Sequence, residues 1–280
     1  MTAFEQITIG KNCIPALVLT IILLIGIPAA AILFWWGKHR KKLRFRYLIA
    51  GAVGFIVSAR VLESGVHYLC LIMDSPVSRF LNGSTAAYVI YGITMAVVFE
   101  EVGRYIILKY IMKKQRTREN AVLYGIGHGG IEILTVVLPL IATYLAFALF
   151  FSSGNLESAL SALKITEENA QAALPVVQAA ASYDYPMAAV NVMERVMAIL
   201  LHVGLSVIVY YSVASGKKRY LLLAVLLHMT ADVFAGLYQA GAASVWAAEG
   251  WFAVCMVIVL VIAAKLYRQS GKLRPEGQVS

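Results

Sequence analysis

The sequence predicts an all-α fold, a polytopic membrane helix bundle of about seven transmembrane helices. The chain of 280 residues is 60% hydrophobic and 14% charged, whereas a soluble domain averages about 25% charged residues. A spanning helix needs about 20 mostly apolar residues, and several separate stretches reach that length. These stretches are residues 12–37, 46–73, 85–112, 120–151, 186–214, 219–240 and 246–267.

The placement of Lys and Arg predicts how the chain crosses the bilayer. Basic residues cluster at 38–46, 109–118, 217–219 and 265–274, all on alternate connections. By the positive-inside rule these connections are cytoplasmic, which puts the N-terminus outside and the C-terminus inside. This placement accounts for the net charge of +9, so we expect no nucleic-acid partner. The charges of the first span follow its apolar run, so it is predicted to be a retained helix and not a signal peptide.

We expect a single integral membrane domain over residues 1–280, in which the helices that carry the motifs are at 85–240. The longest outer loop, 152–186, is rich in Ala, Ser and Glu. This composition predicts either a short amphipathic helix outside or at the interface, as a lid, or a solvated connector, which is the first interpretation. Residues 271–280 are predicted to form a cytoplasmic tail.

The chain has three cysteines, Cys13, Cys70 and Cys255. Their spacing predicts neither a metal site nor a disulfide framework.

Acids and histidines recur inside the predicted spans. Each ionisable residue at the centre of a bilayer costs about 2.5–3.5 kcal/mol on insertion scales, so such residues usually face a protein interior and carry function. Counting from the cytoplasmic end of each span, at about 1.5 Å per residue, places them in one layer roughly 12–20 Å deep. The layer contains Glu100 and Glu101 on the third span, His128 and Glu132 on the fourth, His202 on the fifth, and His228 and Asp232 on the sixth.

The spacing within the spans supports convergence of these groups. His228 and Asp232 are four residues apart, as are His128 and Glu132, so the members of each pair share one helix face. Glycines surround His128 in the segment Gly-Ile-Gly-His-Gly-Gly at 125–130, and they permit close helix approach or a local distortion. One histidine alone is as easily a packing residue. Several histidines and acids at one depth favour a functional site.

The chemistry that this layer can perform is the activation of water. A buried carboxylate holds a proton more tightly and so approaches the range of a general base. Histidines can then bind the developing oxyanion, or hold a Zn²⁺ ion that activates bound water. Either arrangement would hydrolyse a peptide bond inside the membrane. Arg104, one turn from the two glutamates, either orients a carboxylate or forms a structural ion pair.

Two further polar groups have weaker patterns. The second span carries Arg60, Glu63, Ser64 and His67 at helical spacing, which we interpret as a structural or access-lining seam. On the fifth span, Arg195 follows Glu194 and lies two turns from His202 on the same face. Structural ion pairing is the first interpretation of Arg195, and substrate contact is the second.

The order of these motifs resembles that of a known superfamily. Glu100-Glu101-x-x-Arg104, then Tyr124-x-x-x-His128, then His228-x-x-x-Asp232 are similar to the motifs of the CAAX-protease and bacteriocin-processing superfamily of glutamate-dependent intramembrane endopeptidases. The arginine comes one residue earlier than in the superfamily pattern, a spacing that resembles the PrsW branch. The combination of Glu-Glu-Val-Gly-Arg, Gly-His-Gly-Gly-Ile-Glu and Glu-Arg at 194–195 is most similar to the bacterial YhfC family.

The resemblance implies roles for individual residues. Glu100 or Glu101 would be the general base, with Glu100 favoured, and His128 would position the water. His228 with Asp232 would stabilise the oxyanion, although Asp232 can instead orient His228. The remaining polar residues would be supporting groups: Arg104, Glu132, His202 and Arg195.

The resemblance also implies a substrate and a location. The substrate would be a membrane protein or a lipidated peptide in the lipid bilayer of a bacterial cell membrane. No metal is favoured, but zinc remains open, with His128, His202, His228 and Glu132 as its ligands. A non-catalytic scaffold and a cofactor-binding or transport protein remain the alternatives to an enzyme.

Overall fold

A computed structural model describes residues 2–114, 116–154 and 156–272. Within these residues, seven helical segments are long and apolar enough to cross a membrane, which confirms the predicted fold class. The segments are Cys13–His39, Arg46–Ile72, Thr85–Ile111, Arg118–Ser152, Tyr185–Ser215, Arg219–Gln239 and Val245–Ser270. Each agrees with its predicted span to within a few residues. The chain divides into unit 1, comprising Met1–Ala29 and Glu132–Val196, and unit 2, comprising Ala30–Ile131 and Met197–Ser280.

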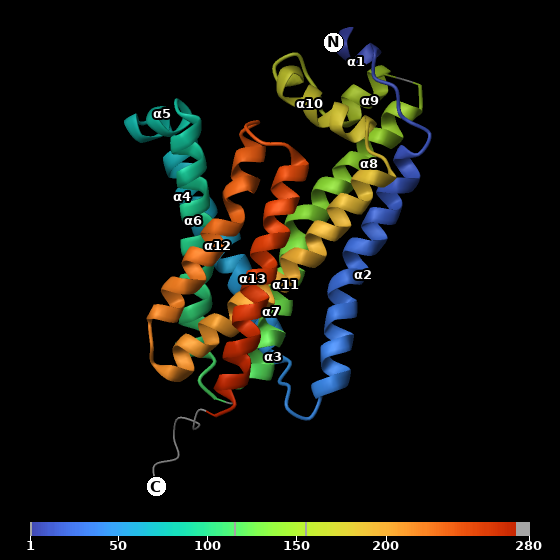
Figure 1. The fold of residues 1–280 in the computed structure, drawn as a ribbon. Helices are drawn as coiled ribbons and strands as arrows, with labels where there is room; N and C mark the ends of the chain where they lie inside the picture. The colour runs from blue at the N-terminus through green and yellow to red at the C-terminus, as the bar shows by residue number, and fades with distance from the viewer. Residues whose placement is uncertain (1, 115, 155, 273–280) are drawn as a thin grey trace. The chain divides into compact units, whose positions relative to one another are not determined.

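Unit 2 contains the second, third, sixth and seventh spans (Figure 1). The second span is built from α3 (Arg46–Phe55), η1 (Ile56–Glu63), α4 (Ser64–His67) and η2 (Tyr68–Ile72), in which η denotes a π-helical segment. After α5 (Pro76–Asn82), the third span consists of α6 (Thr85–Ile106) and η3 (Ile107–Ile111). The last two spans are α12 (Arg219–Gln239) and α13 (Val245–Ser270), and α12 packs against both α6 and α13.

The helix starts in unit 2 follow local sequence signals. Ser84 precedes α6, and its side chain accepts a hydrogen bond from the Ala87 amide. Ser75 and Ser78 form a reciprocal capping box at α5, and Ser244 caps α13 through the Ala247 amide. Such caps satisfy amides that have no partner inside the helix, which matters most where water is scarce.

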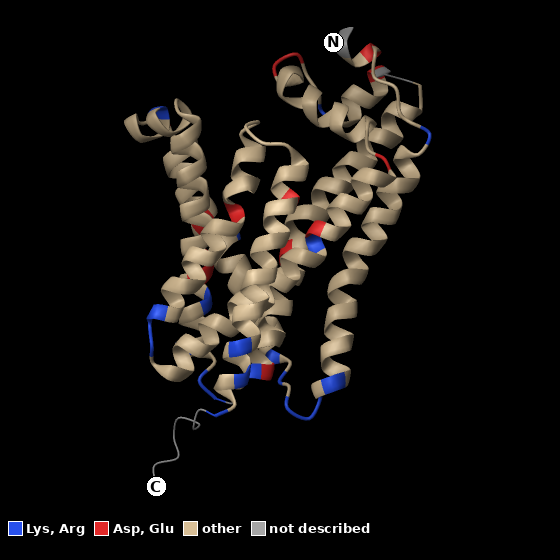
Figure 2. Ribbon diagram, viewed as in Figure 1, with Lys and Arg blue, Asp and Glu red and all other residues tan. Residues whose placement is uncertain are grey.

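Most Lys and Arg of unit 2 gather at one end of its helices (Figure 2), here called the basic end. It is formed by the connections at 38–46, 109–118 and 217–219 and by the end of α13. Immediately above it lies a core of large, fully buried aliphatic side chains, which includes Leu108, Leu123, Leu205 and Ile208. That the basic end faces the cytoplasm stays a prediction.

Three helices carry residues of both units: α2 (Cys13–His39), α7 (Arg118–Glu132) and α11 (Tyr185–Ser215). Every residue of α7 from Glu119 to Gly130 is buried. Its glycines explain why this is possible. A Cβ on Gly127 would lie 2.1 Å from the Leu48 carbonyl oxygen of α3, and a Cβ on Gly125 would lie 2.6 Å from Val203 Cα of α11. The glycine-rich segment therefore allows close helix approach on two sides, one of the two interpretations of its sequence.

Unit 1 contains α1 (Thr2–Glu5), η4 (Ile133–Val137), α8 (Leu138–Ser152), α9 (Leu156–Ala162) and α10 (Ala170–Ala181). The loop for which one short helix was predicted thus forms two helices, α9 and α10. The turn between them includes Lys164 at φ 53°, and the Asn169 side chain accepts from the Thr166 amide. Both helices contribute to a small core around Phe4. Whether the loop is a lid stays a prediction, as does the single-domain assignment. Of the predicted tail 271–280, residues 273–280 lie outside the described residues.

Candidate active site

Unit 2 brings together polar side chains from the third to the sixth spans. Glu100, Glu101 and Arg104 come from α6, His128 from α7, His202 from α11, and His228 and Asp232 from α12. All except Asp232 are at most 9% exposed, and Glu101 and Arg104 are at most 1% exposed. We call these residues the glutamate–histidine cluster.

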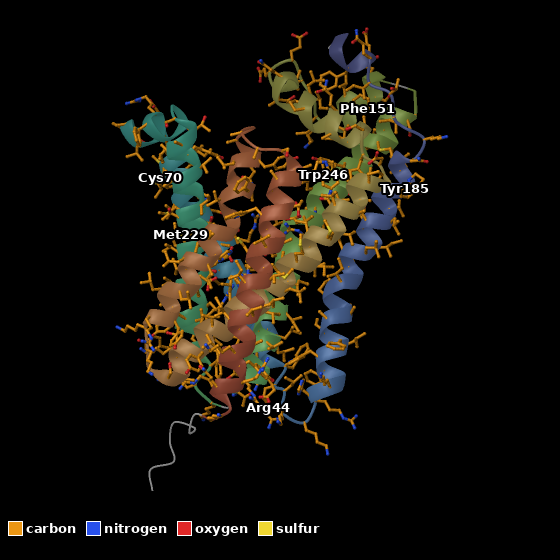
Figure 3. All side chains as sticks on the ribbon, viewed as in Figure 1. Arg44, Cys70, Phe151, Tyr185, Met229 and Trp246 are labelled. Atoms are coloured by element: carbon orange, nitrogen blue, oxygen red, sulfur yellow. The ribbon has the colours of Figure 1, made fainter. Side chains whose placement is uncertain are left out.

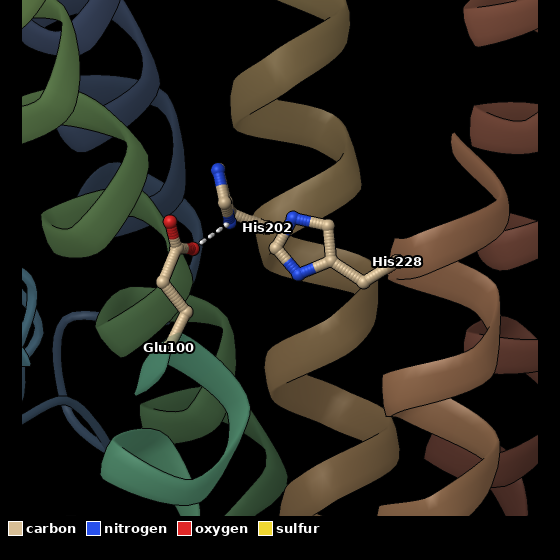
Figure 4. A group of neighbouring side chains, drawn as sticks. All are labelled: Glu100, His202 and His228. Carbon is tan, nitrogen blue, oxygen red and sulfur yellow. Dashed lines mark ion pairs between the residues drawn. The ribbon is translucent and has the colours of Figure 1, made fainter. Parts of the chain in front are cut away.

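Glu100 lies where two histidines approach the same carboxylate oxygen. Its Oε2 is 3.0 Å from His128 Nε2 and 3.9 Å from His202 Nδ1. Figure 4 shows this second approach, with the His228 ring beside His202. At 9% exposure, Glu100 is the more accessible of the paired glutamates. Of the two carboxylates, it is thus the one that a water molecule can reach more easily.

Glu101 is held on both sides. Its carboxylate lies 3.0 Å from Arg104 Nη1 and 2.9 Å from His228 Nδ1, and the side chain is completely buried. Buried charges persist only when paired and hydrogen-bonded. These two contacts compensate the buried charge of Glu101. In turn, Glu101 holds the side chains of Arg104 and His228 in place, and they keep its carboxylate away from solvent.

Arg104 connects the glutamate pair to two histidines. Its Nη2 lies 3.1 Å from His202 Nδ1 and 3.4 Å from His128 Nε2. A guanidinium only donates hydrogen bonds, so each of these ring nitrogens must accept when it bonds Arg104. His128 Nε2 is also 3.0 Å from Glu100. This nitrogen can therefore either accept from Arg104 or donate to Glu100, depending on where its proton resides.

The histidine rings form a continuous group. The centroids of His128 and His202 are 4.6 Å apart, and those of His202 and His228 are 5.5 Å apart with the rings nearly perpendicular. His228 Nε2 lies 3.6 Å from Asp232 Oδ2, a long ion-pair contact one helical turn away. The side chain of Asp232 is 27% exposed, so it lies at the edge of the cluster.

Two predicted supporting residues bind each other in unit 1. Arg195 Nη1 lies 3.0 Å from Glu132 Oε1, and Arg195 also pairs with the adjacent Glu194. This agrees with the first interpretation of Arg195, a structural ion pair. The zinc set suggested by the sequence included Glu132, but the compact donor group in the described residues contains Glu100 instead, with His202 and His228.

The residues of this donor group fit a zinc ion in type and number. Two imidazoles and one carboxylate are a common catalytic zinc set, and their ligand atoms all lie within 4.8 Å of one another. Ligands of a tetrahedral zinc ion are about 3.4 Å apart, given bonds of about 2.0–2.1 Å, so binding needs only small side-chain movements. The Arg104 guanidinium, 3.1 Å from His202, opposes a second cation by charge repulsion.

The polar residues of the second span were predicted to form a structural or access-lining seam, but the sequence did not indicate which other helix they contact. Glu63 is only 8% exposed, and its carboxylate lies 3.1 Å from His67 Nε2. The other ring nitrogen of His67 lies 3.1 Å from the Tyr91 hydroxyl on α6. The i,i+4 acid–histidine pair was visible in the sequence, whereas Tyr91 is 24 residues away and had no distinguishing pattern.

Comparison with known proteins adds to this geometry. A family model described as the YhfC intramembrane metalloprotease matches residues 21–252. The chain belongs to the YhfC family. A YhfC relative from Bacillus subtilis (strain 168), called an uncharacterized membrane protein, is 31% identical over 235 residues, which cover 83% of this chain and 86% of that protein. No solved structure matches.

Membership of the YhfC family confirms the resemblance given by the short motifs of the third to sixth spans. Together with the seven spans, it makes the chain a multi-pass membrane protein. The family description supports an intramembrane protease.

Proposed function

We propose that this chain is an intramembrane endopeptidase in which Glu100 activates the attacking water. The observation that carries this proposal is the contrast between the two adjacent glutamates. Glu101 is fully buried between Arg104 and His228, whereas Glu100 contacts His128 and keeps some exposure. A general base needs such a partner and such access.

The cluster supplies each proton movement of hydrolysis. Glu100 takes a proton from water as the oxygen attacks the peptide carbonyl, and His128 beside it holds the carboxylate in place. The same proton then passes to the nitrogen of the leaving amine as the carbon–nitrogen bond breaks. Bonded to Glu101, His228 in its charged form donates from its other nitrogen to the oxyanion, and Arg104 adds a fixed positive charge. Asp232 lies 3.6 Å from the same nitrogen and orients the His228 ring before the oxyanion takes this hydrogen bond.

Zinc is the second candidate, because Glu100, His202 and His228 form a suitable donor group and the family is described as metalloproteases. A zinc ion bound there would lower the pKa of its water. Glu101 would then accept the hydrogen bond of His228 Nδ1 and hold that ring in orientation. Arg104 could no longer donate to His202, because the ring nitrogen of His202 that does not bind the metal would carry its proton.

The substrates that fit this site are membrane-embedded or membrane-proximal peptide segments, including lipidated peptides, because the cluster lies within spanning helices. A non-catalytic scaffold is the contrasting function. A scaffold has no use for a buried carboxylate as costly as Glu100, which favours the enzyme.

The deciding experiment compares new peptide termini in membranes that contain wild type, Glu100→Gln or Glu167→Gln at equal levels. Glu167→Gln is the control, because it makes the same chemical change at an exposed residue outside the cluster. Termini present with wild type and Glu167→Gln, and lost with Glu100→Gln, would support the protease and identify its substrates. Equal termini in all three would contradict Glu100 as the base, and no termini above an empty membrane would favour the scaffold.

A further inference from the structure

This inference rests on the proposed function, because a protease inside a membrane needs a supply of water. Each cleaved bond consumes one water molecule, yet Glu100, His128, His202 and His228 are at most 9% exposed. Water must therefore cross part of unit 2 to reach them. The polar groups that adjoin the cluster indicate where it can do so.

The basic end of unit 2 does not offer this route. Below the cluster, one or two turns toward the basic end, α6–η3, α7 and α11 present Leu108, Leu123, Leu205 and Ile208, each 0% exposed. Packed aliphatic side chains leave few voids larger than a water molecule, and apolar voids stay dry. This layer closes the cluster on that side.

The opposite side of the cluster is polar. Glu63, His67 and Tyr91 form a hydrogen-bonded row, with contacts of 3.1 Å at each step. The segment η1, which carries Glu63, packs against α6, which carries Glu100 and Glu101, so the row adjoins the cluster. On α6, Tyr91 lies on the side of Glu100 away from the basic end, and on α12, Asp232 lies on the same side of His228.

Exposure increases along the same direction. The side chain of Glu63 is 11% exposed, whereas that of His67 is 31% exposed. Cys70 lies beside the Tyr91 hydroxyl, and Figure 3 labels it on the part of unit 2 opposite Arg44 of the basic end. The second span is π-helical on both sides of Ser64–His67. Such wide turns often occur at functional sites, and here they accompany the polar row.

We propose that Glu63, His67 and Tyr91 line the path by which water reaches the glutamate–histidine cluster, entering from the end of unit 2 opposite the basic end. Each of the three side chains has oxygen or nitrogen atoms that can form hydrogen bonds with a passing water molecule, in place of those it makes in bulk water. The polar row thus has a positioning role for the reacting water, and none of its members takes part in the proposed chemistry.

Cysteine labelling tests this path without any need for proteolysis. The native cysteines are replaced by alanine, and a single cysteine is introduced as Asp232→Cys, on the side of the path, or as Ser206→Cys. Ser206 is 0% exposed, one turn from His202 toward the basic end. Membranes are treated with a charged methanethiosulfonate, which reacts with hydrated thiols. Labelling after unfolding in detergent confirms that each thiol is present and intact.

We expect Asp232→Cys to be labelled in the folded protein and Ser206→Cys to remain unlabelled. Adding His67→Phe to Asp232→Cys should remove most of the labelling, while His67→Gln, which keeps a polar side chain, should retain it. An unreactive Asp232→Cys, a reactive Ser206→Cys, or equal labelling with Phe and Gln at position 67 would each overturn the path. Labelling as expected, together with a wild-type protein that produces no new peptide termini, would sustain the path and refute the protease.

Discussion

The guanidinium of Arg104 lies 3.1 Å from the imidazole of His202, although the two residues are 98 positions apart in the chain. The same guanidinium pairs with Glu101 of its own helix. Arg104 thus links α6 to α11 at the cluster. Because it is 1% exposed, its charge depends entirely on these partners.

Replacement of Arg104 by Met should destabilise the protein by about 3–5 kcal/mol, because Glu101 would be left as a buried charge with one partner fewer. Arg104→Lys should retain more stability but lose activity, since a single ammonium cannot reach Glu101 and the histidines together. Thermal unfolding in detergent and peptide cleavage measure the two effects. Wild-type cleavage by Arg104→Lys would show that the histidine contacts are dispensable.

The two glutamates should respond differently to the same change. Glu101→Gln should lower the unfolding temperature clearly, because it removes one charge of a fully buried pair. Glu100→Gln should change stability by less than about 1 kcal/mol and still abolish cleavage. Measuring both quantities on both variants separates a base from a structural partner, and identical profiles would contradict the assignment.

His228→Ala should reduce cleavage more than Asp232→Ala. His228 is 4% exposed and bonds Glu101 at 2.9 Å, whereas Asp232 is partly exposed and contacts His228 at 3.6 Å. Cleavage rates at equal protein levels give the order. The reverse order would mean that Asp232 does more than orient His228.

Chelation separates the two proposed mechanisms. If Glu100 is the base without a metal, 1,10-phenanthroline should leave cleavage nearly unchanged, and the purified protein should contain no stoichiometric zinc by elemental analysis. Loss of cleavage that zinc restores, together with one bound zinc per chain that disappears in His202→Ala, would instead establish the donor group as a metal site.

Gly127→Ala should destabilise the protein by at least about 1–3 kcal/mol, the usual cost of overpacking, because its Cβ would meet the Leu48 carbonyl oxygen at 2.1 Å. The control is Gly92→Ala on α6, where a Cβ would meet nothing within 4 Å. It should be neutral or stabilising by up to about 1 kcal/mol. Equal unfolding temperatures for the two variants would contradict the close contact between α3 and α7.

Most of the fold could be predicted because span length and apolar composition are local properties. The convergence of Glu100, His128 and His228 also had a sequence signal, since residues at one depth on neighbouring helices face a common layer. The pairing of Arg104 with His202 had none, because depth does not specify which faces meet. For the same reason the sequence grouped Glu132 with the histidines, whereas its carboxylate binds Arg195. In the outer loop, where one helix was predicted, its division into α9 and α10 was missed, because a break at Lys164 depends on backbone conformation.

The pairing of Arg104 with Glu101 also bears on how the protein is made. The two residues are three positions apart on one helix and form their 3.0 Å contact without help from any other segment. During synthesis α6 emerges before α11 and α12, so it must enter the bilayer before His202 and His228 are available. An internal pair offsets two of its three central charges at that stage. The third span can therefore be inserted before the fifth and sixth spans, whose histidines then find their polar partners already positioned.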